Sequence, residues 1–320
     1  MILDKQRAGR TTFAGARAGV AASALLTALF LTGCAQKPTA GASAHPPAAA
    51  RVPVAATIST IAALVQTVGG DKVDVTSIVP IGASPETYDP APRDLVALAQ
   101  AQLIIKNGAG LELWLDKILR NVAKPSATVL VLSDGLPVEG ASGPGQPGNP
   151  HLWLDVTYAQ VYVHKIAAAL RDVDPPNADY YSGNERAEIA RLQKLDTWIR
   201  SRIATIPHAR RTMLTFHDAW LYFDKRYGLR DVGAIEPSPG QAPSAAYLAA
   251  LIDQAKANHV SAVFAEPQFS PKLAQQLASS AGIKTVTDLY DDTLGTTPAL
   301  QTYEGMMQYD VDTIVKALTS

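Results

Sequence analysis

The sequence of 320 residues contains a single cysteine, so no disulfide can form within the chain and no cysteine-rich metal site is possible. It also lacks an excess of charge, because 28 Lys and Arg residues face 29 Asp and Glu residues. Without a basic excess to neutralise phosphates, nucleic acid is not an expected partner. With 47% hydrophobic residues the chain is neither disordered nor a coiled coil, and its length suits two domains of roughly 100–200 residues each.

Beyond residue 34 no uninterrupted apolar run approaches the roughly 18 residues that a membrane span requires. At the N-terminus, four basic residues precede an apolar run at 18–31, a pattern typical of an export signal. The run ends in Leu31-Thr32-Gly33-Cys34, which resembles the lipobox of bacterial lipoproteins, where cleavage precedes a lipid-modified Cys. The alternative is a secretory signal with a chance cysteine.

We therefore predict a lipoprotein signal peptide at 1–33 and lipidation of Cys34. Residues 34–51 are rich in Ala and Pro and are expected to form a flexible tether. The body is then anchored to the membrane by lipid, in the cell envelope, and faces the periplasm or the extracellular side.

From Val52 onward, short apolar runs alternate with segments of helical spacing. Runs of this kind are typical of strands buried on both faces of a parallel sheet. The expected strands lie at 52–58, 73–79, 102–107, 128–133, 212–216, 230–235, 261–266 and 283–289. The expected helices lie at 59–68, 92–99, 111–121, 156–171, 218–227, 245–257, 272–280 and 303–318.

A longer helix is predicted between the two series, because apolar residues from Ile189 to Ile203 recur every three or four positions. About 25 helical residues span ~38 Å, the height of a small domain. The predicted fold is α/β, with two lobes that each contain a mainly parallel sheet flanked by helices, joined by one long backbone helix. The boundaries are 52–177 for the N-terminal lobe, 178–206 for the linking helix and 207–320 for the C-terminal lobe.

Four side chains that can bind metal lie in the segments that follow predicted strands: Glu86, His151, His217 and Asp292. Ligands of open α/β sheets bind beyond the carboxyl ends of the strands. Since each half contributes two of the four, an ion held by all of them lies in the cleft between the lobes. Two imidazoles and two carboxylates suit one divalent first-row transition metal.

At these residues the chain resembles the substrate-binding lipoproteins of bacterial zinc and manganese ABC transporters. The resemblance extends over nearly all of 52–318. The family's four ligand segments are Pro-His-x-Tyr, Pro-His-x-Trp-Leu-Asp, Thr-x-His-Asp-Ala and Asp-Ser/Ala-Leu/Ile-Gly. They are matched in that order by Pro85–Tyr88, Pro150–Asp155, Thr215–Ala219 and Asp292–Gly295, with Thr293 in the small-residue position. The resemblance implies a monomeric, non-enzymatic carrier that captures the metal and delivers it to an ABC permease and its ATPase, which are separate chains.

One ligand departs from the family pattern, because Glu86 stands where many members have His. A carboxylate that binds through one or two oxygens raises the coordination number and favours manganese or ferrous iron over tetrahedral zinc. The loop at 137–150 also lacks the histidines of many zinc importers. Against this, the general affinity order places zinc above manganese, so both remain open. In the alternative interpretation Glu86 faces solvent, and three ligands and water hold the metal.

Three acidic residues are candidates for supporting the ligands. Asp218 and Asp291 are each adjacent to a ligand and can accept a hydrogen bond from an imidazole N–H. Glu266, at the end of a predicted strand, is a candidate supporting group, and the alternative is an extra ligand. Asp155 is expected to cap the helix that follows it.

Two other functions compete with the carrier. A metal-dependent hydrolase requires an open coordination position and a general base, and the sequence contains neither an HExxH nor a GxSxG motif. An adhesin-type lipoprotein would hold its metal structurally, and would unfold when the metal is removed.

Overall fold

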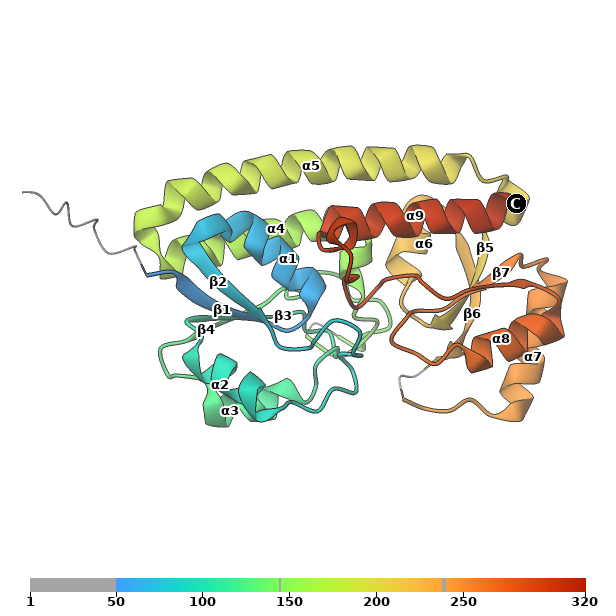
Figure 1. The fold of residues 1–320 in the computed structure, drawn as a ribbon, viewed down its shortest axis with the longest axis horizontal. Helices are drawn as coiled ribbons and strands as arrows, with labels where there is room; N and C mark the ends of the chain where they lie inside the picture. The colour runs from blue at the N-terminus through green and yellow to red at the C-terminus, as the bar shows by residue number, and fades with distance from the viewer. Residues whose placement is uncertain (1–49, 144, 238–239) are drawn as a thin grey trace, which may run out of the picture. The chain divides into compact units, whose positions relative to one another are not determined.

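The computed structural model describes residues 50–143, 145–237 and 240–320. The predicted signal peptide, Cys34 and nearly all of the predicted tether lie outside these residues. The described chain forms two four-stranded parallel sheets flanked by helices and bridged by one long helix (Figure 1), which confirms the predicted fold class.

The N-terminal sheet has the strand order β2-β1-β3-β4. Its strands are β1 (Val52–Ala56), β2 (Val73–Ser77), β3 (Leu103–Lys106) and β4 (Thr128–Val131). Helices α1 (Ser59–Gly69) and α4 (Val156–Val173) lie on one side, and α2 (Pro92–Gln100) and α3 (Leu115–Val122) on the other, as Figure 1 shows. The central strands carry Val54, Ile104 and Ile105, all buried, as expected for a sheet covered on both faces.

The C-terminal sheet repeats this arrangement with the order β6-β5-β7-β8. Its strands are β5 (Thr212–His217), β6 (Arg230–Glu236), β7 (Ala262–Phe264) and β8 (Lys284–Val286). Its helices are α6 (Leu221–Tyr227), α7 (Ala245–Ala257), α8 (Lys272–Ala281) and α9 (Tyr303–Thr319). Short 3₁₀ helices occur at Gly70–Lys72, Leu152–Leu154, Pro175–Asn177, His208–Arg210 and Pro298–Leu300.

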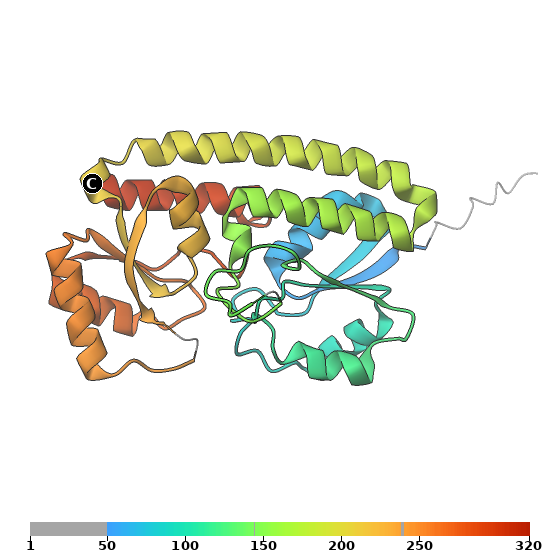
Figure 2. The same cartoon turned by 180° about the vertical axis from the view of Figure 1, so that it is seen from behind.

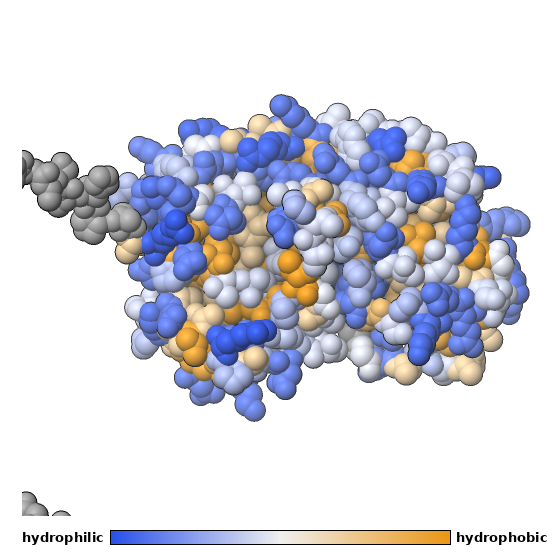
Figure 3. Space-filling model, viewed as in Figure 1, coloured by the Kyte–Doolittle hydropathy of each residue, from blue (hydrophilic) through white to orange (hydrophobic). Residues whose placement is uncertain are grey.

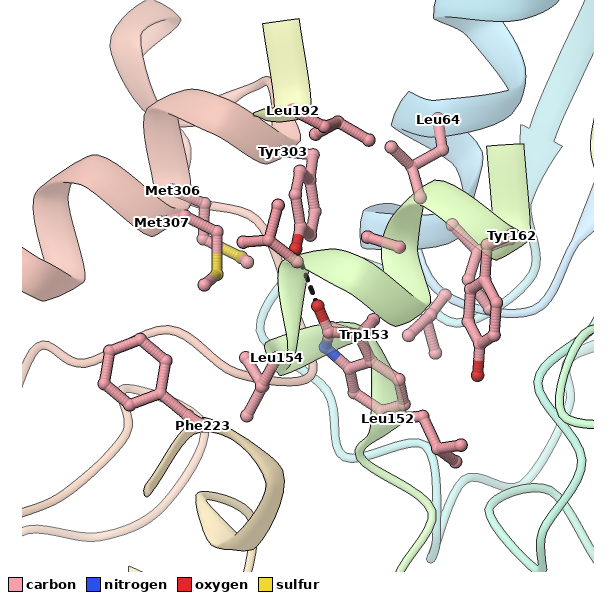
Figure 4. Close-up of a cluster of buried hydrophobic side chains, with 14 of the residues drawn as sticks. Leu64, Leu152, Trp153, Leu154, Tyr162, Leu192, Phe223, Tyr303, Met306 and Met307 are labelled. Atoms are coloured by element: carbon pink, nitrogen blue, oxygen red, sulfur yellow. Dashed lines mark hydrogen bonds between the residues drawn. The ribbon is translucent and has the colours of Figure 1, made fainter. Parts of the chain in front are cut away.

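Helix α5 (Ala178–Ala204) passes along both lobes and packs on α1, α4, α6 and α9 (Figures 1 and 2). Its buried face includes Leu192, Leu195, Ile199 and Ile203, the positions that the helical spacing indicated. One hydrophobic cluster joins the lobes, with Leu152–Leu154 beside Phe223 and Tyr303 (Figure 4). Because a continuous helix and a shared core connect the lobes, wide hinge bending is disfavoured.

Two helices begin later than the sequence predicts. The helix expected at 111–121 begins at Leu115, because the buried Glu112 carboxylate accepts the backbone N–H groups of Asn107 and Gly108 at 2.7 and 2.9 Å and holds the preceding loop. The helix expected at 218–227 begins at Leu221. There the chain bends directly after His217, whose carbonyl accepts the N–H of Ala219 at 2.9 Å.

In the described part of the chain, no helix combines the length and apolar character needed to cross a membrane. The face drawn in Figure 3 is mainly hydrophilic, with small apolar patches between polar residues.

Candidate metal centre

Three of the four candidate ligands meet in one buried cluster. His151 directly precedes the 3₁₀ helix Leu152–Leu154, His217 is the last residue of β5, and Asp292 lies in the loop after β8. Each is 1% exposed, and their ligand atoms all lie within 4.8 Å of one another. The carboxyl end of β5 and two loops thus converge where the rule for open α/β sheets predicts.

The spacing of these three groups suits a single metal ion. The Nε2 atoms of His151 and His217 are 3.3 Å apart. Asp292 places Oδ1 at 3.3 Å from Nε2 of His151 and Oδ2 at 3.8 Å from Nε2 of His217. Bonds of 2.0–2.1 Å to a tetrahedral ion separate neighbouring donors by ~3.3 Å. Within the described residues, neither Asp292 carboxylate oxygen accepts a hydrogen bond, so this buried group lacks a partner that a cation supplies.

Glu86 lies at the border of this cluster. Together with His151, His217 and Asp218 it lines a cavity of about 340 Å³. Its Oε2 atom is buried and has no hydrogen-bond partner among the described residues, although Glu86 is not part of the group within 4.8 Å. The preceding carbonyl, that of Pro85, accepts a hydrogen bond from Nε1 of Trp114 at 2.8 Å.

The far side of the His217 ring contacts two carboxylates. Its Nδ1 atom lies 3.2 Å from Oε1 of Glu266 and 3.4 Å from Oδ2 of Asp291. Asp291 is itself held by Nε2 of Gln268, at 2.9 Å from its Oδ1. A proton on Nδ1 leaves Nε2 free to bind a metal, and this arrangement fixes that tautomer. His217, Glu266 and Asp291 also form a second cluster that has metal-ligand spacing.

The corresponding partner of His151 is Asn149, which the sequence analysis did not identify. Its Oδ1 atom lies 3.0 Å from Nδ1 of His151 and accepts the backbone N–H of His151 at 3.2 Å. Nδ2 of Asn149 donates to the carbonyl of Asp218 at 2.7 Å. The hydroxyl of Tyr222 donates to the backbone carbonyl of Asn149 at 2.8 Å. The sequence signal was an Asn-Pro pair two residues before the histidine, a dipeptide typical of loops whose Asn side chain bonds to nearby backbone.

Other residues considered from the sequence lie away from the cluster. Asp218 lines the same cavity, but it is exposed and its backbone carbonyl makes the contact with Asn149. His164, His208 and His259 are all exposed, and none belongs to a described metal-like cluster. Asp155 caps α4 as predicted, because its carboxylate accepts the N–H of Thr157 at 2.8 Å.

Burial and mutual charge shift the protonation of the cluster. Burial raises the pKa of Asp292 to about 8, and Asp291 adds to this effect. Burial, with Asp292 nearby, raises the pKa of Glu86 to about 7. Burial and the neighbouring His217 lower the pKa of His151 to about 4. For His217, burial opposes protonation, but the carboxylates of Asp291 and Glu266 outweigh it and raise its pKa. A divalent cation neutralises this excess of carboxylates.

Comparison with known proteins identifies related sequences. The family described as zinc-uptake complex component A, periplasmic, matches residues 54–317. The manganese-binding lipoprotein MntA of Halalkalibacterium halodurans is 31% identical over 272 residues, which cover 83% of this chain and 88% of that protein. The iron-binding protein YfeA of Yersinia pestis is 32% identical over 265 residues, which cover 82% of this chain and 85% of that protein.

Solved structures show the same architecture. The periplasmic zinc binding protein TroA from Treponema pallidum superposes with a TM-score of 0.78 at 26% identity, covering 84% of this chain and all of that chain. The Mn-bound periplasmic metal binding protein from Candidatus Liberibacter asiaticus gives a TM-score of 0.75 at 26% identity and covers 83% of this chain and 98% of that one.

Proposed function

This chain belongs to the periplasmic zinc-uptake complex component A family, and on that premise we propose that it captures one manganese or zinc ion between its lobes for delivery to an ABC permease. Membership makes the chain a metal-binding, non-enzymatic, extracytoplasmic component of an ABC uptake system. The permease and its ATPase are separate chains, and the carrier acts as a monomer.

The ligands in this proposal are Glu86, His151, His217 and Asp292. The observation that carries it is the buried Asp292 carboxylate, which faces two Nε2 atoms at 3.3 and 3.8 Å and accepts no hydrogen bond from the described residues. A buried carboxylate without a partner is costly unless it is protonated or binds a cation. Glu86 completes the set from the lining of the cavity, where its buried Oε2 also has no hydrogen-bond partner among the described residues.

Two carboxylates and two imidazoles support manganese as well as zinc. Hard carboxylate oxygens suit manganese, whereas imidazole nitrogens suit zinc. Relatives differ in the same way, since one is named a manganese-binding lipoprotein, another an iron-binding protein and a solved structure a zinc-binding protein. If Glu86 binds through both oxygens, the coordination number exceeds four and manganese gains relative to zinc.

The proposal includes a lipid anchor at Cys34. The lipobox-like segment 31–34 follows a basic and apolar leader, and the related protein MntA of Halalkalibacterium halodurans is named a lipoprotein. A single anchored Cys keeps the carrier at the membrane, near its permease.

The test is metal analysis of the mature protein purified without added metal, followed by competitive titration with zinc and manganese. A carrier binds one ion per chain, releases it to a chelator while still folded, and binds it again. Binding also raises the stability of the folded state by ~4 kcal/mol at a thousandfold excess over Kd. A melting temperature unaffected by both metals would contradict the proposal, and unfolding on chelation would indicate a structural metal instead.

A further inference from the structure

The loop that carries Asp292 leaves its own sheet and bonds to the N-terminal lobe. The N–H of Leu294 donates to Oγ of Ser59, the first residue of α1, at 2.9 Å. The N–H of Gly82 donates to Oγ1 of Thr293 at 3.0 Å, and the two hydroxyl oxygens lie 3.5 Å apart. We call Ser59, Gly82, Thr293 and Leu294 the interlobe clasp. Ser59 and Thr293 are 7% and 2% exposed, so their hydroxyl groups are largely shielded from water, whereas Gly82 is exposed.

A second contact holds the backbone on the other side of Asp292. Nε1 of Trp153 donates to the carbonyl of Asp291 at 2.8 Å. The carbonyl of Trp153 accepts the hydroxyl of Tyr303 at 2.7 Å, as Figure 4 shows. Trp153 follows His151 by two residues and lies within the core shared by the lobes. On the side of the C-terminal lobe, Gln268 holds the Asp291 carboxylate.

These backbone contacts decide where the Asp292 carboxylate lies, because no described donor bonds to the carboxylate itself. We infer that Thr293 is a positioning residue that fixes Asp292 to the N-terminal lobe through the clasp. Glu86, His151 and Asp292 then form a preassembled half of the site, and His217 is the one ligand presented by the C-terminal sheet. This inference rests on the proposed function and its ligand set. Chain order alone would divide the ligands two and two.

The hydroxyl of Thr293 is the part of this residue that the clasp needs. It accepts the Gly82 N–H and donates to the carbonyl of Leu294 at 3.2 Å. Without it, the N–H of Gly82 loses its partner and the loop of Asp292 is freer to move.

Three variants test this role in the mature protein. Thr293→Val replaces the hydroxyl with a methyl group of similar size, and Thr293→Ser restores the hydroxyl. Thr60→Val is the matched control, because Thr60 is buried on α1 and its hydroxyl contacts only the sulfur of Met306, at 3.9 Å, among the described residues. Zinc and manganese affinity are measured by competition with a chromophoric chelator, and bound Co²⁺ reports the coordination geometry through its visible absorption.

We expect Thr293→Val to weaken metal binding by about tenfold or more, the range for residues that orient a ligand. The Co²⁺ absorption changes with it, Thr293→Ser recovers both properties, and Thr60→Val matches the parent. The same loss persists in a His217→Ala background, because the three-ligand half remains there.

If the parent binds metal tightly and Thr293→Val binds it as tightly as Thr60→Val does, the inference is wrong but the proposed function stands. A loss that disappears in the His217→Ala background would overturn the division of ligands into three and one. A parent that binds no metal would overturn the proposed function as well. If Thr293→Val does not fold, Ser59→Ala takes its place, since it removes the acceptor of the Leu294 N–H, and the same outcomes apply.

Discussion

His151 and His217 face one another through their Nε2 atoms, 3.3 Å apart, although 66 residues separate them in the chain. Each ring has an oxygen partner at its other nitrogen: Asn149 for His151 and Glu266 for His217. The two Nε2 atoms are therefore aimed at one point by separate supports. Because the two supports are separate, we expect the loss of either one to weaken metal binding by itself.

Removal of His217 tests the centre itself. His217→Ala deletes a nitrogen donor that no neighbouring side chain replaces, so metal affinity is expected to fall by several orders of magnitude while the fold persists. His164→Ala is the matched control, because His164 is exposed on α4 and pairs with Glu185 at 2.6 Å. Competitive titration and circular dichroism provide the measurements. Unchanged affinity in His217→Ala would place the site elsewhere.

The support of His151 is tested at Asn149. Asn149→Ala removes the acceptor at Nδ1 of His151 and the donor to the Asp218 carbonyl. We expect metal affinity to fall by about 10–100-fold, because the ring loses its fixed tautomer and orientation. Asn121→Ala is the control, since Asn121 bonds only within α3 at the surface of the described chain. Parent-like affinity in Asn149→Ala would show that the imidazole is held by packing alone.

Strand ends and ligand types were predictable from the sequence because they depend on local patterns. Apolar runs identify the strands, and the rule for carboxyl ends then selects the residues that follow them, including His217 at the end of β5. Orientation was not predictable in the same way. Asp218 and Asp291 are each next to a candidate ligand, but only Asp291 contacts His217. The tight bend after His217, closed by the N–H of Ala219, leaves Asp218 exposed instead.

The start of α3 also could not be predicted from local sequence patterns. Helical spacing extends back to residue 111, but the buried Glu112 accepts hydrogen bonds from the loop and from Thr57 on the neighbouring segment. Such a long-range contact overrides local helix propensity and has no signature in the periodic pattern.

Acidification is expected to weaken metal binding. Without metal, burial raises the pKa of Asp292 to about 8 and that of Glu86 to about 7, and the carboxylates of Asp291 and Glu266 raise the pKa of His217, so these groups bind protons near neutral pH that the ion must displace. The apparent affinity therefore falls as pH decreases from about 8 to about 6, by up to tenfold per unit for each displaced proton. The pKa of His151, lowered to about 4, keeps this ring neutral throughout.

Calorimetric titration at neutral pH in two buffers with different ionisation enthalpies measures the released protons directly. Identical enthalpies in both buffers, together with an affinity independent of pH, would show that the carboxylates are already ionised and His217 is already neutral without metal.

The anchor is tested at Cys34, which lies outside the described residues. Cys34→Ala removes the thiol that we propose is lipidated, so the protein is expected to remain unprocessed or to leave the membrane fraction. Ser43→Ala, within the predicted tether, is the control and should be processed like the parent. Fractionation and the mass of the N-terminal peptide provide the measurements. A Cys34→Ala protein that is cleaved before residue 34 and stays with the membrane would reject the lipobox.

The remaining prediction concerns Glu86, where the sequence departs from its family. Glu86→His replaces a hard oxygen donor with nitrogen and produces a three-His, one-Asp set, so preference should move towards zinc. Glu86→Gln keeps the shape but removes a negative charge near the cation, so it should weaken both metals. The control is Glu139→Gln, because Glu139 lines the same cavity but forms an ion pair with Lys225 at 2.7 Å. If all three variants keep the zinc-to-manganese affinity ratio and the affinities of the parent, Glu86 is not a ligand, and water completes a site of His151, His217 and Asp292.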